Sequence, residues 1–311
     1  MSNQEPEQTF RAYTAAQGQT YDQTRFRYHP NFFKRVLDHH TSTGGELGTV
    51  IDVGCGPGIA TRELAPFFTH AIGADPSEGM IVTAKKLGGS SATKDIQYVC
   101  SSAEALDCGA ADGTVDLITA ATAAHWFDMP RFWARAEQLL RPGGSVAIWS
   151  MNNGGVHADV PNHEAINRSV EEIRKRELEP YYGAGNRVSR DLYIDLGLPW
   201  TVSPAVSGFE EDSFLRVEWG TEGNVDAEQE GEEFLVNGQT WVKMSFAEAL
   251  MGTGSPITRW REANPDKTGE EDVVRIMRRE IERLLREAGV AEEDMAVKVK
   301  MTGVLLVVKK K

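Results

Sequence analysis

Short apolar runs alternate with stretches of helical periodicity between residues 48 and 151. Runs typical of buried strands occupy residues 48–54, 70–75, 96–103, 115–124 and 145–151. Helical spacing of apolar positions predicts helices at residues 32–39, 60–68, 77–87 and 129–140, and Ser77 is placed to cap the third of them. The alternation predicts an α/β fold that is doubly wound around a mostly parallel sheet with right-handed crossovers.

The alternation breaks after Asn152. Helices are predicted at residues 162–178, 245–250 and 270–289, with a strand at residues 213–219 and a hairpin or terminal strand at residues 295–310. The helix at 270–289 is strongly amphipathic, with a stripe formed by Val274, Met277, Ile281 and Leu284. We therefore expect one domain: an N-terminal lid and first helix (1–47, its first 20 residues flexible), a ligand-binding core (48–151), and sheet completion with helical insertions (152–311).

The composition and charge of the chain argue against several classes of binding partner. The 311 residues carry a formal net charge of −13, which argues against nucleic acid as a partner because phosphates need a basic surface. The acidic stretch at residues 209–234 is interpreted as a solvated loop face. Apolar runs stay well short of the ~18 residues that a membrane span needs, and the polar N-terminus lacks signal-peptide features, so we expect a cytoplasmic protein without a membrane partner. The three cysteines are scattered and the histidines lack ligand spacing, so no metal is expected.

A glycine-rich turn follows the first strand of the core. Gly54, Gly56 and Gly58 occupy alternate positions, whereas a dinucleotide turn would place its third glycine where Ile59 stands. The turn, with Pro57 inside it, suits a smaller anionic group such as a ligand carboxylate at a helix N-terminus.

Two further segments lie at the ends of predicted strands. Asp75 ends the second strand, 17 residues after Gly58, where a carboxylate can accept hydrogen bonds from two ribose hydroxyls. Its alternative role is to cap the helix that follows. Ala103 and Glu104, after the third strand, are placed to line an adenine slot, with an exposed surface position as the alternative for Glu104.

Together these segments resemble the class I S-adenosylmethionine-dependent methyltransferases, over "VIDVGCGPG", "AIGADPSEGMI", "SSAEAL", "VDLITAATAAHWFD" and "LLRPGGSVAIWS". The resemblance implies a seven-stranded Rossmann-like sheet with a helical cap over the acceptor site. It also implies S-adenosyl-L-methionine as cofactor, S-adenosyl-L-homocysteine as product, and no metal. Carried onto this sequence, the cofactor contacts are Tyr21, Asp52, Gly54, Cys55, Gly56, Gly58, Asp75, Pro76, Ser77, Met80, Ser102, Ala103, Glu104 and Ala120.

A finer resemblance is to the trans-aconitate methyltransferase group of carboxyl O-methyltransferases. Residues 21–34, 123–128, 147–151 and 179–192 are similar to segments of that group, and Tyr21, Arg25 and Tyr28 keep their places. Phe26 and His29 replace its usual prolines, and "MGTGSPITRW" replaces its Thr-Trp-Ser segment. The resemblance implies methylation of a small di- or tricarboxylic acid.

Acceptor binding is expected from arginine, whose planar fork binds carboxylates bidentately. The candidates are Arg25, Arg187, Arg190 and Arg259, with Tyr28 and Tyr182 beside them; a solvated surface position is the alternative for each arginine. His125 and Trp126 follow the fourth strand, where acceptor and methyl group should meet. His125 is expected to hydrogen-bond the acceptor, or to act as a base if the acceptor atom is a hydroxyl; its alternative is a packed histidine. Trp126 is expected to line the pocket and to exclude water from it.

Three hypotheses remain open at this point. The acceptor is a carboxylate; it is a hydroxyl, amine or carbon of another small molecule; or the chain binds the cofactor without catalysis. The expected partner is a small anionic molecule. The protein is expected to be a monomer or a homodimer, since the helix at 270–289 could pack internally or at an interface.

Overall fold

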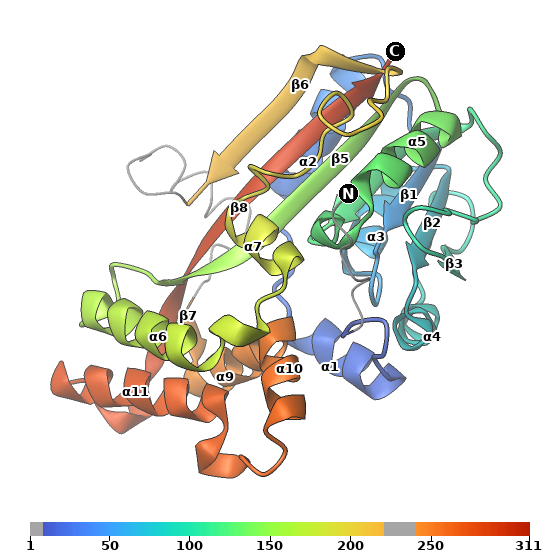
Figure 1. Cartoon of the computed structure of the whole chain (residues 1–311). Coiled ribbons are helices and arrows are strands. Elements are labelled where there is room, and N and C mark those ends of the chain that lie inside the picture. The colour runs from blue at the N-terminus through green and yellow to red at the C-terminus, as the bar shows by residue number, and fades with distance from the viewer. Residues whose placement is uncertain (1–8, 221–240) are drawn as a thin grey trace.

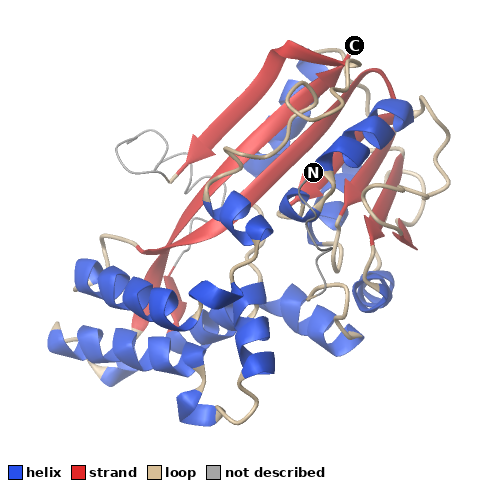
Figure 2. Ribbon diagram, viewed as in Figure 1, coloured by secondary structure: helices blue, strands red, loops and turns tan. Residues whose placement is uncertain are grey.

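A computed structural model describes residues 9–220 and 241–311 of the chain. Its described residues form an eight-stranded sheet in the order β3-β2-β1-β4-β5-β8-β6, with β7 paired to one end of β8 (Figures 1 and 2). The pairs from β3 to β5 are parallel, and β8 runs antiparallel to its neighbours. The strands are β1 (Thr49–Val53), β2 (His70–Asp75), β3 (Gln97–Cys100), β4 (Val115–Ala121), β5 (Leu140–Val156), β6 (Phe209–Trp219), β7 (Trp241–Lys243) and β8 (Ala296–Lys310).

Helices cover both faces of the sheet. In β1, Val50 packs with the residues of α2 (Pro30–Ser42), α3 (Ile59–Leu64) and α4 (Glu78–Leu87), while its neighbour Ile51 packs with α5 (Met129–Leu139) on the opposite face. Successive side chains point to opposite faces of a strand, so a strand buried on both faces reads as a continuous apolar run. This confirms the doubly wound α/β fold predicted from the sequence.

A third apolar cluster forms the helical cap. It joins α6 (His163–Glu177), α9 (Met244–Gly252), α10 (Ser255–Ala263) and α11 (Val273–Glu287) to the N-terminal part of β8. Figure 1 shows the cap at the far end of the long strands β5 and β8, beyond the edge where β1 and β2 end. The stripe of α11 formed by Val274, Met277, Ile281 and Leu284 is buried in this cluster, as its periodicity predicts.

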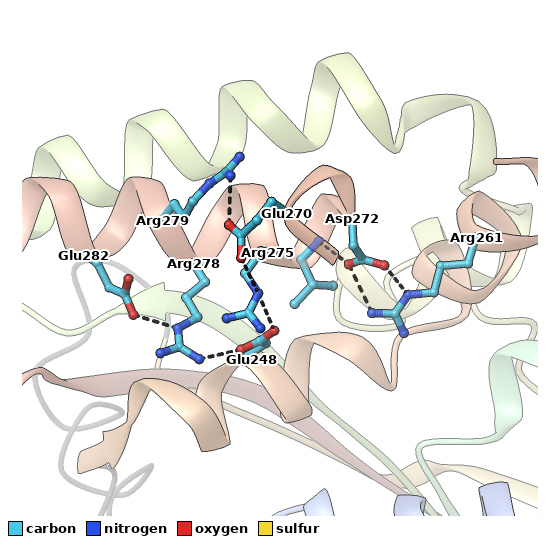
Figure 3. A network of polar contacts seen from close by, with 9 residues as sticks. Glu248, Arg261, Glu270, Asp272, Arg275, Arg278, Arg279 and Glu282 are labelled. Atoms are coloured by element: carbon cyan, nitrogen blue, oxygen red, sulfur yellow. Dashed lines mark hydrogen bonds and ion pairs between the residues drawn. The ribbon is translucent and has the colours of Figure 1, made fainter. Parts of the chain in front are cut away.

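Ion pairs and hydrogen bonds between charged side chains link the cap helices to one another (Figure 3). Glu248 of α9 pairs with Arg278 of α11 at 2.6 Å and with Arg275 at 3.3 Å. Asp272 caps α11 by accepting from the Val274 backbone N–H at 2.9 Å, and it also accepts from Arg261 of α10 at 2.7 Å.

Several sequence predictions need correction. The sheet has eight strands in the described residues, not seven, because β7 adds a short pair with β8. The strand predicted at residues 213–219 is longer than expected, because residues 209–212 of the acidic stretch also belong to β6, which pairs with β8, rather than to a loop; residues 221–234 lie outside the described residues. Of the two alternatives for residues 295–310, the terminal strand is confirmed as β8 and the hairpin is not.

The N-terminal segment also differs from its prediction. Of the residues 1–20 expected to be flexible, residues 15–20 belong to α1 (Ala15–Thr24), which begins with a capping box between Thr14 and Gln17, and residues 1–8 lie outside the described residues. The Thr83 hydroxyl of α4 donates to the Ala15 carbonyl at 3.0 Å, which ties α1 to the core. Among the helices of the described ranges, none combines the length and apolar character needed to cross a membrane.

Candidate active site

A cavity of about 420 Å³ lies between the carboxyl ends of β1, β2 and β4 and the helical cap. It brings together residues that are far apart in the sequence. The predicted site residues on its wall are Tyr21, Arg25, Tyr28, Gly54, Cys55, Gly56, Asp75, Pro76, Met80, Ala103, Glu104, His125, Trp126, Tyr182 and Arg190.

The glycine turn forms one end of the cavity. Gly54, Gly56 and Gly58 have φ angles of 66°, 53° and 85°, a region that L-residues with a side chain rarely adopt. The N–H groups of Gly54 and Cys55 both donate to the Ala74 carbonyl of β2, at 2.8 and 3.1 Å. A Cβ on Gly54 would lie 2.5 Å from the Cβ of Ala123, whereas one on Gly56 would enter open space. The turn is therefore a tightly packed bend whose middle faces the cavity.

Asp75 lies beside this turn. One carboxylate oxygen accepts from the Gly56 N–H at 2.9 Å and the other from the Ser77 N–H at 2.8 Å. The helix cap of α4 is Ser77, whose hydroxyl accepts from the Met80 N–H. Because each carboxylate oxygen has two lone pairs, Asp75 can accept further hydrogen bonds on its cavity side.

Five residues predicted to contact the cofactor do not reach the cavity wall. Asp52 lies beneath the turn, 1% exposed, where it accepts from the hydroxyls of Thr61 at 2.6 Å and Thr119 at 2.8 Å. Burial raises the pKa of Asp52 to about 6, against the opposing effect of these hydrogen bonds. The Asp52 side chain therefore links β1 to α3 and β4 by hydrogen bonds.

The other four also have structural roles. Gly58 is the residue before α3 and packs against the Tyr98 hydroxyl, and Ser77 caps α4. Ser102 accepts from the Ala105 N–H within a turn at 3.3 Å, and Ala120 is fully buried inside the sheet.

Glu104 and Ala103 form the side of the cavity next to β3. Ala103 is buried, and a Glu104 carboxylate oxygen accepts from the Asp128 N–H at 3.0 Å. Glu104 is thus held on the wall by the residue that caps α5, rather than standing free on the surface.

Arg25 faces the other end of the cavity. Its guanidinium lies 4.6 Å from the centre of the Tyr21 ring, and one terminal nitrogen lies 3.5 Å from the Thr253 carbonyl. Its Nε is buried and has no hydrogen-bond partner. Arg174 of α6 lies on the same wall, and no carboxylate among residues 9–220 and 241–311 pairs with either arginine.

The other three arginines predicted to bind the acceptor lie in different surroundings from Arg25. Arg190 lies at the cavity and 5.8 Å from the Tyr182 ring, with Asp191 3.6 Å away. Arg187 and Arg259 are off the wall, so the structure does not bring them together with the other residues predicted to bind the acceptor. Arg187 is exposed and pairs with Glu179 at 3.2 Å, and Arg259 donates to Asn186 and Ser255, linking α10 to α7 (Ala184–Arg190).

His125 lies on the wall near Arg25. Burial, together with the charge of Arg25, lowers the pKa of His125 to about 3, so the imidazole is neutral at neutral pH. Its Nδ1 lies 2.8 Å from the Tyr193 hydroxyl. Trp126 packs against His125 and lies 6.2 Å from the Phe10 ring, so the N-terminal segment covers this part of the cavity.

Tyr28 has one edge on the cavity, but its ring packs against Phe32, Phe33 and Trp149. Burial raises the pKa of Tyr28 to about 12. Its hydroxyl therefore stays protonated.

Sequence reasoning missed several residues of the wall. Arg174 occurs in a highly charged helix, where nothing in the sequence separates it from its exposed neighbours. Met277 belongs to the apolar stripe of α11, whose periodicity predicts packing inside the protein or at an interface and not a place on a cavity wall. The residues missed include Phe10, Arg11, Met151, Asn152, Arg174, Asn186, Ser189, Met251, Met277 and Met301. In the part of the chain that the structure describes, no group of three or more His, Cys, Asp or Glu side chains is arranged to hold a metal ion.

Parts of this chain are similar to known methyltransferases. Residues 51–148 match the model of a methyltransferase domain family. A methyltransferase-named protein of Dictyostelium discoideum is 36% identical over 163 residues, covering 52% of this chain and 56% of its own length. A protein of Saccharomyces cerevisiae named as an S-adenosylmethionine-dependent methyltransferase is 29% identical over 130 residues, covering 42% of this chain and 43% of its own. The chain thus spans about half the length of these curated relatives.

A solved structure described as a type II methyltransferase, from Anaeromyxobacter dehalogenans, superimposes with a TM-score of 0.57 and 22% identity. The match covers 92% of this chain and 96% of that one. At this identity the likeness concerns the fold, and it extends over the cap as well as the sheet.

Proposed function

We propose that this chain, which carries the domain of the class I S-adenosylmethionine-dependent methyltransferases, transfers a methyl group to a carboxylate oxygen of a small acid. The match over residues 51–148 and the methyltransferase-named relatives support the class of reaction. The carboxylate acceptor rests on the arginines of the cavity.

The end of the cavity formed by β1 and β2 fits the cofactor. A side chain at Gly56 would occupy open space on the wall, and the Asp75 side chain, held by the Gly56 and Ser77 N–H groups, lines the same cavity. We propose that the glycine turn holds the amino-acid end, that Asp75 binds the ribose and that Ala103 and Glu104 flank the adenine. When bound, S-adenosylmethionine supplies the electrophilic methyl group of its sulfonium.

The observation that carries the acceptor assignment is the buried Nε of Arg25, which has no partner. A buried polar group without a hydrogen bond is costly, so its presence on a cavity wall favours a ligand that completes it. A carboxylate fits, because the guanidinium fork binds it bidentately. Arg174 and Arg190 on the same wall are available for a second carboxylate.

The protonation of the site favours a carboxylate over a hydroxyl as the methylated group. A carboxylate is already ionised at neutral pH and needs no base. His125, with a pKa of about 3, is a weak base for removing a hydroxyl proton. Catalysis would rest on positioning the two reactants and excluding water.

The acceptor end of the wall also has an apolar part. It includes Met151, Met251, Met277 and Met301, whose flexible thioether side chains adapt to different shapes. The sequence resemblance favours a di- or tricarboxylic acid such as trans-aconitate; this surface favours an acid that also presents apolar atoms.

An acceptor screen tests the proposal. Mono-, di- and tricarboxylic acids, trans-aconitate among them, would be incubated with the chain and methyl-labelled cofactor, and the products treated with base. Methyl esters release the label, whereas methyl ethers, amines and C-methyl groups retain it. Base-stable labelled products from these acids would overturn the assignment.

Arg25→Ala supplies the second arm of the test. We expect it to raise the KM for the acid at least about tenfold, corresponding to ~1.4 kcal/mol, and to leave S-adenosylhomocysteine affinity within about twofold. Arg187→Ala is the matched control, because it removes an arginine that lies off the cavity. Equal effects of the two substitutions would contradict the role of Arg25.

A further inference from the structure

The helical cap contributes an apolar surface to the cavity wall. Leu178, Ile257 and Met277 line the cavity, and all three also belong to the buried apolar cluster of the cap, with at most 4% of each residue exposed. Met251 and Met301 line the cavity as well and pack against the same cluster. We call these five side chains the apolar cap surface. Through them the cavity reaches the apolar core of the cap.

Arg25 lies beside the apolar cap surface, since one of its terminal nitrogens is 3.5 Å from the carbonyl of Thr253, two residues after Met251. Within residues 9–220 and 241–311, its Nε is the one buried side-chain polar atom of the cavity wall that has no hydrogen bond. Arg190 needs no ligand, because its side chain is 53% exposed. Arg174 has no buried nitrogen without a partner in the same ranges. One guanidinium that lacks a partner requires one carboxylate.

The surface next to Arg25 suits hydrocarbon. An ionised group placed against apolar side chains is costly, because it loses water without gaining a hydrogen bond. A methylene group placed there leaves water for an apolar surface, which improves binding by a factor of about three to four. Three of the five side chains are methionines, whose unbranched thioethers adapt to the shape of a flexible chain.

We infer that the acceptor is a monocarboxylic acid with an aliphatic chain, its carboxylate held by Arg25 and its chain lying against the apolar cap surface. This inference rests on the proposed function for methylation of the carboxylate. It differs from the di- or tricarboxylic acid that the sequence resemblance implies. The difference coincides with the segment "MGTGSPITRW", residues 251–260, where the sequence departs from that group and which supplies Met251 and Ile257 to the wall.

Met277 limits the length of chain that this surface accepts. It is 1% exposed, and it belongs both to the cavity wall and to the core of the cap. The next residue, Arg278, pairs with Glu248 of α9 at 2.6 Å and so holds α11 in place. The space at this point of the wall is therefore set by the Met277 side chain, and shortening that side chain makes room for a longer acid.

A series of acids tests the substrate class. Butanoate, hexanoate, octanoate and decanoate would be compared as acceptors with methyl-labelled cofactor. We expect the KM to fall about threefold for each added methylene from butanoate to octanoate. Suberate, which adds a second carboxylate to the chain of octanoate, is the matched control and should have a KM at least about tenfold higher than octanoate. A KM independent of chain length, or a KM for suberate, succinate or trans-aconitate equal to or below that for octanoate, would overturn the inference.

Met277→Ala tests the role of that side chain. We expect it to lower the KM for decanoate relative to that for octanoate by at least about threefold. Met295→Ala is the control, because Met295 belongs to the same buried cluster and lies off the cavity wall. The ratio of two KM values from one preparation does not depend on how much of the protein is folded. Equal shifts of the ratio in the two variants would contradict the assignment of Met277.

Calorimetry without turnover separates this inference from the proposed function. Octanoate titrated into the chain saturated with S-adenosylhomocysteine should bind at least about tenfold more tightly than suberate. If octanoate binds in this way but no acid is methylated, the proposed function fails and the assignment of an aliphatic monocarboxylate to the cavity holds. If octanoate does not bind, or binds no better than suberate, the inference is overturned even where another acid is methylated.

Discussion

The two ends of the cavity are built by different means. At the end proposed to hold the cofactor, the geometry is set largely by backbone: Gly54 and Cys55 donate to the Ala74 carbonyl, and Gly56 donates to Asp75. At the acceptor end, the wall consists of side chains from many elements, such as Arg174 of α6 and Met277 of α11. A backbone scaffold keeps its geometry when side chains change, whereas a wall of side chains changes with each substitution.

The largest expected effect is at the cofactor end. Gly54→Ala places a methyl group at φ 66° and 2.5 Å from the Cβ of Ala123, so the turn or β4 must shift. We expect the Kd for S-adenosylhomocysteine to rise by about 100-fold, or ~2.7 kcal/mol, as measured by calorimetry.

Gly88→Ala is the control for that substitution. Gly88 has φ 68° at the end of α4, and a Cβ there would meet nothing within 4 Å. Gly88→Ala therefore has the conformational cost of a side chain at positive φ, but it causes no steric clash. Unchanged cofactor affinity in Gly54→Ala would show that the backbone does not set this end of the site.

The contrast between a backbone-built end and a side-chain-built end also separates the features that the sequence predicts from those that it does not. The glycine turn, Asp75 and the succession of strands and helices in the core follow from local spacing, because a strand, a tight turn and a helix in succession specify a backbone path. Arg174 and Met277 could not be found, since their side chains meet the cavity only through the packing of the cap. The position of Asp52 relative to the cavity is a related case. Its spacing puts it at the end of β1, but only the burial by Thr61 and Thr119 shows that it points beneath the turn.

A second prediction concerns pH and the acceptor end. His125 has a pKa of about 3 in the folded chain and about 6.5 when unfolded, so the unfolded state binds more protons between these values. Its contribution to stability is therefore complete above pH 6.5 and is lost as pH falls toward 3. Between pH 7.5 and pH 5 we expect a loss of about 2 kcal/mol in the free energy of unfolding from this group.

Comparison with His125→Gln, by urea unfolding at both pH values, isolates that contribution. Asp52 acts in the opposite sense, because its raised pKa makes the folded state bind more protons, so stability falls as pH rises from about 4 to about 6. The difference between the two proteins removes the Asp52 contribution. Parallel pH profiles would show that His125 does not titrate as a buried group.

A third prediction concerns α1, which connects the two ends. Asp22 of α1 accepts from Arg62 of α3 at 2.7 Å, and Arg62 also donates to the Pro57 carbonyl inside the glycine turn at 2.6 Å. Asp22→Asn turns one acceptor into a donor facing two arginines, Arg62 and Arg27. We expect a loss of about 1.5 kcal/mol in the free energy of unfolding, measured in urea. Asp38→Asn, which removes an exposed pair with Lys34, is the control and should change stability less.

The smallest expected effect is at the charged network of the cap. Glu248 pairs with Arg275 and Arg278 at positions that are each about one quarter to one third exposed, so solvent screens the pairs (Figure 3). Glu248→Gln should lower the free energy of unfolding by about 0.5–1 kcal/mol at low salt, and by less in 1 M salt, where charges are screened within ~3 Å. Because the network lies in the cap, cofactor affinity should stay within about twofold while the acceptor KM rises modestly. A larger change in cofactor affinity than in acceptor KM would mean that the two ends are coupled through α11, and that the separation between a backbone-built end and a side-chain-built end does not hold in solution.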